Sequence, residues 1–270
     1  MVKVFVVLGE MWAADEKALQ KADRRMDRFE KESRMLEKRS EEYDVMEEVF
    51  DKPTLMTLLD LMNNHAFRYL NGVVNAGKES RVYWGVKHDG STVAVKIYLI
   101  VSAEFKKRLI YIQGDPRFNH VKKGLTNLVE LWARKEYRNL STAYSAGMRV
   151  PRPHHVKRNV LIMDFIGQDG KPAPLLNEVE VTQFDYARVL KMIERLYKKA
   201  RLVHADLSEF NLFKDHRQLV MFDFASAVDI AHPSSKFFLT RDITNINHFF
   251  ARRGVDVASL DDILRRVTVP

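Results

Sequence analysis

A short polar segment, HADLSEFN from His204 to Asn211, constrains this chain more than any other stretch. Asp206 lies five residues before Asn211, and a second aspartate, Asp223, follows the apolar run LVMF twelve residues after Asn211. One carboxylate can orient and deprotonate an attacking hydroxyl or water. The other, with an amide oxygen, supplies the few protein oxygens that Mg²⁺ takes beside phosphates. The segment predicts phosphoryl transfer, with Asp206 as base and with Asn211 and Asp223 as metal ligands.

A lysine inside an apolar strand provides a second part of the site. Residues 93–98 are VAVKIY, and the ammonium of Lys96 needs an anion because an unpaired buried charge is costly. The sequence VAVK is typical of the kinase strand whose lysine holds the α- and β-phosphates and pairs with a glutamate on the next helix. Glu136 is the preferred partner, and Glu130 is the alternative.

The turn before that strand is the third part. In NAGKESRVY, residues 75–83, a small residue and a glycine let backbone N–H groups approach phosphates closely. The residues expected to bind nucleotide here are Gly77, Lys78, Glu79, Ser80 and Val82. The spacing from Gly72 to Lys78 also fits a Walker A loop, but Glu79 replaces the required Ser or Thr and a strand follows instead of a helix.

The order of predicted elements indicates an α+β protein with two lobes. Residues 1–50 mix both charges at helical spacing, which predicts a charged N-terminal helical extension. Residues 51–166 are expected to form the N-lobe, and its irregular basic stretch 105–123 is expected to be flexible. The regular elements predicted in this lobe are an apolar helix from Pro53, three meander strands within 73–98, a helix over 125–146 ended by Gly147, and a buried strand over 159–166.

Residues 167–270 are expected to form a reduced, mostly helical C-lobe. A loop at 168–174 is the predicted hinge between the lobes. Thr182 is placed to cap a helix that runs to Ala200. The residues expected along the apolar side of that helix are Phe184, Val189, Met192, Ile193 and Leu196. Two more helices are predicted, over 240–253 and 259–267.

Composition excludes several classes of chemistry. The chain has no cysteine, which rules out disulfides, cysteine-ligated zinc, iron–sulfur clusters and a thiol nucleophile. No apolar run approaches the ~18 residues of a membrane span, so we expect a cytoplasmic protein without a membrane partner. The 44 Lys and Arg against 36 Asp and Glu give a net charge of +8, which permits an anionic partner.

Basic clusters mark the faces where such a partner could bind. Residues 149–158 hold four basic residues and two histidines without an acid, and Lys198, Lys199 and Arg201 form a second cluster. RNA contact through these residues is the prediction, with a solvated surface as the alternative. His154 and His155 have no acidic neighbour in sequence, so a metal site is not expected there.

These motifs together resemble the RIO type of atypical serine/threonine protein kinase, in the subfamily without an N-terminal winged helix and of archaeal kind. The resemblance covers roughly residues 45–265. Its marks are GKES at 77–80 instead of a glycine-rich loop, and Ser208 where ordinary kinases place a lysine. Further similar segments are YIQGDPRF from Tyr111 and RDITNINHFF from Arg241.

The resemblance implies a two-lobed protein-kinase-like fold that binds ATP with Mg²⁺, or with Mn²⁺. It implies that the carbonyl of Asp164 and the N–H of Ile166 meet adenine behind Met163 as gatekeeper. It also implies autophosphorylation, an aspartyl-phosphate on Asp223, and a role in maturation of the small ribosomal subunit, whose precursor or rRNA would be the partner.

Three functions remain open from the sequence. Only 47 residues follow Asp223 and no Ala-Pro-Glu motif is among them, which favours a kinase with ATPase activity over a broad peptide kinase. A catalytically silent RNA-binding assembly factor is one alternative, although Lys96 and Asp206 are both present. A small-molecule kinase of the aminoglycoside or choline type is the other, although arginines stand where its acidic helices would follow.

Overall fold

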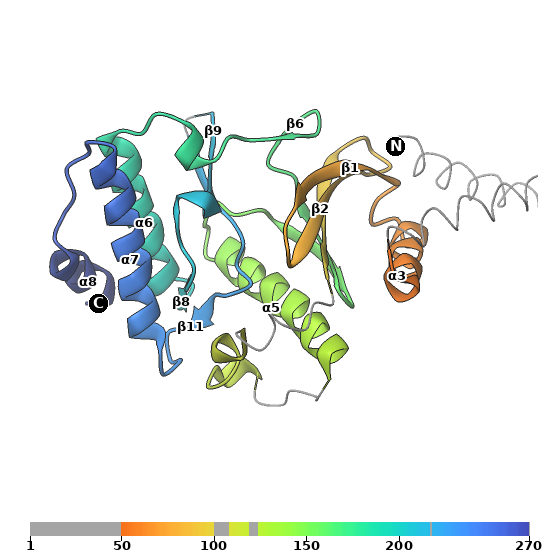
Figure 1. Cartoon of the computed structure of the whole chain (residues 1–270), viewed down its shortest axis with the longest axis horizontal. Helices are drawn as coiled ribbons and strands as arrows, with labels where there is room; N and C mark the ends of the chain where they lie inside the picture. The colour runs from red at the N-terminus through yellow and green to blue at the C-terminus, as the bar shows by residue number, and fades with distance from the viewer. Residues whose placement is uncertain (1–49, 100–107, 119–123, 217, 270) are drawn as a thin grey trace, which may run out of the picture.

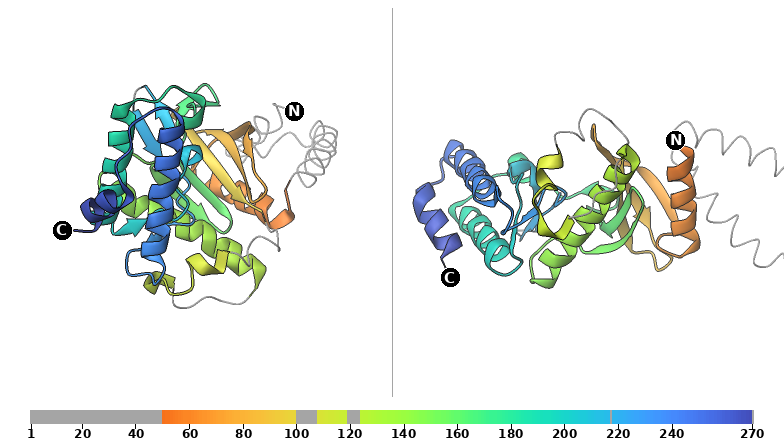
Figure 2. Two further views of the ribbon diagram at one scale, coloured as in Figure 1. Left: turned by 60° about the vertical axis from the view of Figure 1, so that its left-hand side comes forward. Right: turned by 90° about the horizontal axis from the view of Figure 1, so that it is seen from below.

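The structure is a computed structural model that describes residues 50–99, 108–118, 124–216 and 218–269. A sheet with helix α3 lies at one end of the molecule, helices α6, α7 and α8 lie at the other, and α5 runs between them (Figures 1 and 2). The predicted two-lobed α+β arrangement is therefore confirmed. The predicted extension over 1–49 lies outside the described residues. Among those that are described, no helix is both long and apolar enough to cross a membrane.

The N-lobe sheet has five antiparallel strands in the order β1-β2-β3-β5-β4. The predicted meander forms β1, β2 and β3, while β5 is the predicted buried strand and pairs with both β3 and β4. The bounds are β1 Tyr69–Ala76, β2 Ser80–Val86, β3 Thr92–Tyr98, β4 Pro153–Lys157 and β5 Val160–Asp164. This pairing puts Lys96 of β3 between Val82 of β2 and Leu161 of β5.

Two helices cover this sheet. Helix α3, Lys52–Asn63, begins where the Asp51 side chain accepts the N–H of Thr54, and its apolar side is buried on the sheet. Helix α5, Leu125–Ser145, packs on β3, β4 and β5. It ends as predicted, because Gly147 has φ +72°, a left-handed conformation that favours glycine.

The C-lobe is built on helices α6 Gln183–Lys198, α7 Ser235–Arg252 and α8 Leu260–Thr268. Thr182 caps α6 in a reciprocal box with Asp185, as predicted. The short strands are β6 Gly167–Gln168, β7 Lys171–Pro172, β8 Leu202–Val203, β9 Leu212–Asp215, β10 Gln218–Met221 and β11 Val228–Asp229. They form three two-stranded sheets, β6 with β7, β8 with β11 and β9 with β10.

Three details differ from the sequence predictions. The hinge at 168–174 contains the β6–β7 ribbon instead of an open loop. Helix α7 begins at Ser235, five residues earlier than expected. Phe184 is 78% exposed, because it shares the outer side of α6 with Arg188 and Lys191, one and two turns along, while the buried side starts at Asp185 and Tyr186.

The described part of the stretch 105–123 is packed. Residues 108–118 form two short 3-10 helices, η1 Leu109–Tyr111 and η2 Pro116–Phe118. Ile112 and Asp115 are each 1% exposed, and the ring of Tyr111 stacks on Phe238 of α7. The remainder, 105–107 and 119–123, lies outside the described residues, so flexibility of the whole stretch stays a prediction.

One buried histidine makes the stability of this fold depend on pH. His204 is 1% exposed, its ring lies edge-on to Phe224, and its Nε2 is 3.0 Å from the carbonyl oxygen of Phe222. Burial lowers the pKa of His204 from 6.5 to about 4. Between these values the unfolded chain binds the proton and the folded chain does not, so the free energy of unfolding falls as the pH falls through this window.

We expect His204 to contribute a loss of up to about 3 kcal/mol between pH 6.5 and 4. The measurement is urea unfolding of the natural chain and of His204→Gln across this range. Because other groups titrate in both proteins, the difference between their pH profiles isolates the histidine. Profiles that run parallel would contradict the assignment.

Candidate active site

Side chains of helix α7 hold the segment that carries Asp206. The carboxylate of Asp242 accepts the N–H of Ala205 at 2.8 Å and the N–H of Leu207 at 2.9 Å. Its neighbour Arg241 donates to the Ala205 carbonyl. Ala205 has φ +63°, a costly conformation for a residue with a Cβ, so these bonds hold a strained turn in place. Because the bonds are made to Ala205 and Leu207, they fix the backbone on both sides of Asp206.

Asp206 lines the cavity, and Asn211 is bonded to its backbone. The Nδ2 group of Asn211 donates to the Asp206 carbonyl at 2.7 Å, so the amide oxygen is the atom of Asn211 that can bind a metal. Burial and the nearby Asp223 carboxylate raise the pKa of Asp206, against Arg241 and Arg108, which lower it. A base with a raised pKa is better matched to proton transfer near neutral pH.

Lys96 joins the two lobes at the centre of the site. Its Nζ lies 2.9 Å from Oε2 of Glu136 on α5 and 2.8 Å from Oδ1 of Asp223. The predicted pair with Glu136 is therefore present. The alternative, Glu130, instead contacts Arg158 at 3.1 Å and Arg134 at 3.6 Å, on the outer side of the helix.

The charges of Lys96, Glu136 and Asp223 depend on one another. Burial alone would lower the pKa of Lys96, but the carboxylates of Asp223 and Glu136 outweigh it and raise that pKa, so the ammonium stays charged. Burial raises the pKa of Glu136 to about 7, although Lys96 opposes the shift. The same ammonium lowers the pKa of Asp223 against the effect of burial, which keeps this carboxylate ionised as a metal ligand must be.

The predicted phosphate loop lies beside Asp223. Gly77, Lys78, Glu79 and Ser80 line one hollow together with Asp223, and the N–H of Gly77 donates to the Ser80 carbonyl. Val82 is half-buried on β2, directly across from Lys96. The β1–β2 hairpin thus brings the loop predicted from the sequence close to the carboxyl groups of Asp206 and Asp223.

The predicted adenine-binding residues lie at the end of β5. Met163 is 9% exposed, and the N–H of Asp164 donates to the Arg152 carbonyl. The Asp164 carboxylate lies 2.7 Å from Nε2 of His154, so this histidine has an acidic neighbour in space although it has none nearby in the sequence. The reason is that β4 and β5 pair across a tight turn, which sequence distance does not reveal. Ile166 accepts a backbone hydrogen bond from Ala173.

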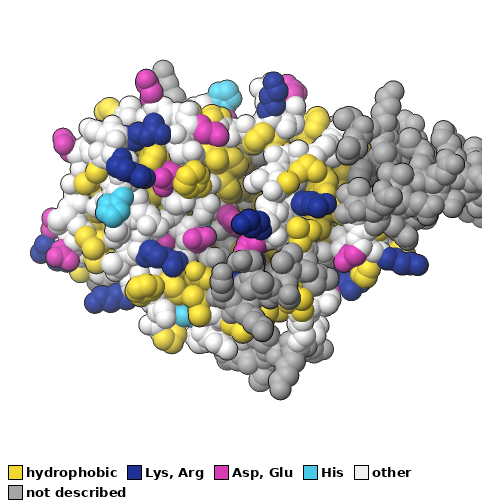
Figure 3. All heavy atoms as spheres, in the orientation of Figure 1, with side chains coloured by type: hydrophobic (Ala, Val, Ile, Leu, Met, Phe, Trp, Pro, Cys, Tyr) yellow, Lys and Arg dark blue, Asp and Glu magenta, His cyan; other side chains and the backbone are white. Residues whose placement is uncertain are grey.

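Some of these groups line a cavity of about 300 Å³ between the lobes, whereas Asn211 and the predicted adenine-binding residues Met163, Asp164 and Ile166 are not in its lining. Its lining includes Lys96, Arg108, Tyr111, Trp132, Asp206 and Asp223. On the face shown in Figure 3, acidic side chains meet a basic one in the middle, where the two lobes join. Within the ranges the structure describes, no three His, Cys, Asp or Glu side chains gather as a metal site, so a metal here needs Asn211 and phosphate oxygens as well.

Two residues of this site were not predicted in their roles. Arg108 was placed in the irregular basic stretch 105–123, yet its side chain is 8% exposed, pairs with Glu79 and lies 4.9 Å from the Trp132 ring centre. Asp242 was noticed as part of a motif, without a function. Neither role has a local sequence signal, because each depends on contacts between distant segments.

Comparison with known proteins gives one consistent result. The RIO domain profile matches residues 81–263. The RIO-type serine/threonine-protein kinase Rio1 of Haloferax volcanii is 38% identical and is matched over 96% of this chain and 91% of its own length. Rio1 of Methanocaldococcus jannaschii is also 38% identical, over 89% and 81%. Human RIO1 is 36% identical over 83% of this chain, which spans 41% of that longer protein.

The fold comparison agrees with the sequence comparison. The Rio2 kinase of Chaetomium thermophilum, solved as an ADP/Mg²⁺-phosphoaspartate complex, superposes with a TM-score of 0.61 at 23% identity. The superposition covers 79% of this chain and 66% of that one. This superposition establishes the kinase-like fold. The sequence matches, at higher identity, also identify the family. By these matches the chain belongs to the RIO family, in the group of RIO1-type serine/threonine kinases.

Proposed function

We propose that this chain is a Mg-ATP-dependent atypical serine/threonine kinase that autophosphorylates and hydrolyses ATP. The observation that carries the proposal is the convergence of Lys96, Asp206 and Asp223 on one cavity, beside the phosphate loop. The names of the RIO1 relatives support the kinase activity, and the ADP and Mg²⁺ in the Rio2 complex support the choice of nucleotide and metal.

The residues present fit a magnesium ion. Asp223 uses Oδ1 for Lys96, its side chain is 44% exposed toward the cleft, and the Asn211 amide oxygen is the second oxygen donor. Two protein oxygens suit Mg²⁺, which completes its shell with phosphate and water. When bound, the ion would neutralise charge on the phosphates. Mn²⁺ takes the same ligand types and is the alternative metal.

The chain's own groups then have separate tasks. Lys96, held by Glu136, neutralises the phosphates, and the backbone of Gly77 to Ser80 covers them. Asp206 accepts the proton of the attacking hydroxyl or water, so turnover should decline on acidification at a higher pH than an ordinary aspartate would give. In the aspartyl-phosphate step, an oxygen of the Asp223 carboxylate attacks the γ-phosphorus and ADP leaves with the electrons of the broken P–O bond.

Two other functions would give different results in one experiment. A silent RNA-binding factor would bind nucleotide without turning it over. A small-molecule kinase would be stimulated by an aminoglycoside or choline. Measuring ADP release alone, with those small molecules, and with small-subunit precursor particles separates the three, and the proposal requires turnover that the small molecules do not accelerate.

A partner with phosphate groups is supported by a basic groove between α6 and the segment after α5. The groove has a volume of about 370 Å³ and is lined by Gly147, Met148, Arg149, Arg188, Lys191, Met192, Arg195, Gln218 and Leu219. Four of these are cationic and none is acidic. Arg149 comes from the predicted basic cluster, whereas Lys198 is paired with Glu194 and Lys157 with Asp60. We propose ribosomal precursor RNA as the occupant, in line with a role in small-subunit maturation.

The first prediction from the proposed function concerns Lys96. Lys96→Ala should lower the affinity for Mg·ADP by about ten- to a hundredfold, because a charged hydrogen bond to phosphate is removed and Glu136 loses its partner. Isothermal titration calorimetry measures the change. Lys157→Ala, which removes an exposed lysine paired with Asp60, is the control and should bind normally. Unchanged affinity in Lys96→Ala would refute the phosphate-binding role.

The second prediction separates the two aspartates. Asp206→Asn should reduce turnover by about 10²–10⁴-fold while Mg·ADP binds as before, because Asp206 acts on the nucleophile. Asp223→Asn should lose the Mg²⁺-dependent part of the affinity and all hydroxylamine-sensitive phosphate on the chain. Calorimetry measures binding, ADP release measures turnover, and phosphate released from the chain by hydroxylamine measures the aspartyl-phosphate. Equal weakening of binding in both variants would contradict this division of roles.

The third prediction tests the basic groove. Reversing charge at Arg149 and Lys191 together should weaken precursor RNA binding and reduce its salt dependence by about 0.7–0.9 log units for each phosphate that the protein no longer neutralises. Fluorescence anisotropy at several salt concentrations measures both. Arg265→Glu with Arg266→Glu makes the same change of charge on α8, outside the groove, and serves as the control. RNA affinity equal in the two double variants would leave the groove without this function.

A further inference from the structure

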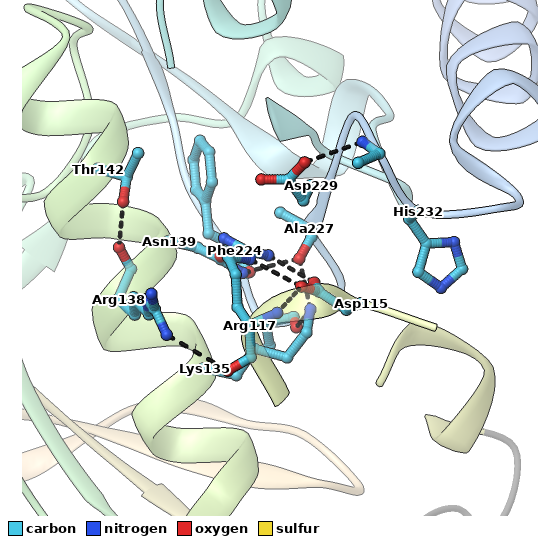
Figure 4. Close-up of polar contacts among 12 residues, drawn as sticks. Asp115, Arg117, Lys135, Arg138, Asn139, Thr142, Phe224, Ala227, Asp229 and His232 are labelled. Carbon is cyan, nitrogen blue, oxygen red and sulfur yellow. Dashed lines mark hydrogen bonds and ion pairs between the residues drawn. The ribbon is translucent and has the colours of Figure 1, made fainter. Parts of the chain in front are cut away.

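Three buried side chains on one side of α5 contact the segment that follows Asp223. Lys135, Glu136 and Asn139 are each 0% exposed, and all three face residues 224–227 of the C-lobe. Figure 4 shows Lys135 and Asn139 meeting the backbone of Phe224 and Ala227. Only Glu136 has a task in the site described above, so the other two need an explanation.

Lys135 and Asn139 both donate to backbone carbonyls. The Lys135 ammonium contacts the carbonyl oxygens of Ala225, at 3.0 Å, and of Ala227. Nδ2 of Asn139 donates to the carbonyls of Phe224 and Ala227, each at 2.8 Å. The Glu136 carboxylate completes the set by accepting the Phe224 N–H. The backbone directly after Asp223 is thus fixed by side chains of a single helix.

The segment needs to be held because Asp223 is in a strained conformation. Its φ is +63°, the left-handed region that residues with a Cβ rarely adopt. Such a conformation persists where the surroundings over-determine it. If the carbonyls of 224–227 were released, Asp223 could relax toward an ordinary conformation and its carboxylate would turn away from the phosphate loop.

A second layer orients Asn139. Its Oδ1 accepts a hydrogen bond from Arg117 at 2.8 Å, which directs Nδ2 toward the two carbonyls. Arg117 is in turn held by Asp115 in a two-pronged pair, with contacts of 2.8 and 2.6 Å, and Asp115 is 1% exposed. The chain of contacts therefore runs from residues 115–117 through α5 to the segment after Asp223.

The lysine is costly to keep at this position. Burial lowers the pKa of Lys135 well below its ordinary value, with Arg117 acting in the same direction. A buried amine without a carboxylate within bonding range adds little to the stability of a fold compared with an apolar side chain of similar size. The amine supplies two carbonyl contacts that an apolar side chain cannot, beside cation–π contacts with the Trp132 ring at 5.4 Å and the Phe118 ring at 5.9 Å.

We infer that Lys135 and Asn139 are positioning residues for the metal-binding carboxylate: they fix the backbone of 224–227 so that Asp223 faces the phosphate loop. Neither residue lines the cavity that holds Lys96 and Asp223. The inference rests on the proposed function for the identity of the metal site. Because α5 also carries Glu136, one helix sets both the lysine that binds phosphate and the carboxylate that binds the ion.

The test is the Mg²⁺ dependence of ADP binding, followed by calorimetry in the full chain. Lys135→Met and Asn139→Leu should each raise the Mg²⁺ concentration for half-maximal enhancement of ADP binding by about tenfold, as loss of groups behind a metal ligand does. The affinity for ADP without metal should stay within about twofold, since Lys96 and the phosphate loop are untouched.

A matched control separates positioning from general stability. Lys214 donates to the Glu180 carbonyl and pairs with Asp185 at 2.9 Å, and these bonds involve none of residues 223–227. Lys214→Met should lower the melting temperature without moving the Mg²⁺ half-saturation. If Lys135→Met and Asn139→Leu also leave it unmoved while they melt earlier, the two residues are only structural and the inference is wrong.

A milder variant keeps the inference testable if the buried variants do not fold. Arg117→Gln removes the group that orients Asn139 while leaving α5 intact, and it should shift the Mg²⁺ half-saturation in the same direction by a smaller factor. Arg117→Lys, which keeps a donor, should restore part of the loss. A normal Mg²⁺ dependence in Arg117→Gln would overturn the second layer of the proposal. If metal-free ADP binding is absent even in the natural chain, the proposed function fails instead.

Discussion

The ammonium of Lys96 is the group on which the rest of the structure depends. It is 6% exposed in the middle of an apolar strand, so it must be paired, and its two partners come from helix α5 and from the segment after β10. Burying an isolated charge would cost more free energy than the net stability of a typical domain. The two lobes are therefore tied to one another at the same atom that is expected to meet the phosphates.

Most of the helices and strands could be predicted from the sequence because their signals are local. The alternation in 93–98, the Thr182 cap and the glycine at 147 each act within a few residues. The failures have a different physical origin. Phe184 lies on the exposed side of α6, and a face drawn from apolar residues alone cannot tell which side meets the lobe. The β6–β7 ribbon forms in a segment whose composition indicates only a turn.

The residues of the site also fall into two groups, those that have a local sequence signal and those that do not. Lys96 is marked by its apolar strand, and Asp206, Asn211 and Asp223 by their spacing; the structure brings Lys96, Asp206 and Asp223 to one cavity, with Asn211 bonded to the Asp206 carbonyl. Arg108, Asp242 and Asn139 are recognised only when distant segments are seen side by side, since each contacts residues far away in the sequence, and the partners of Asp242 and Asn139 are mostly backbone atoms. A carbonyl or an N–H leaves no trace in the identity of its residue, and sequence patterns are for that reason poor at finding groups that hold a loop in place.

The anchoring of the Asp206 turn by Asp242 has a consequence for synthesis of the chain. The strands that carry Lys96 and the phosphate loop are complete before residue 100, but the turn lacks its anchor until 36 further residues after Asp206 have been added. At about 5–20 residues per second this is a delay of roughly two to seven seconds. During that interval the nascent chain has the N-lobe strands of the nucleotide cleft, but the turn that carries Asp206 is not yet fixed. The onset of activity is therefore delayed until α7 has folded.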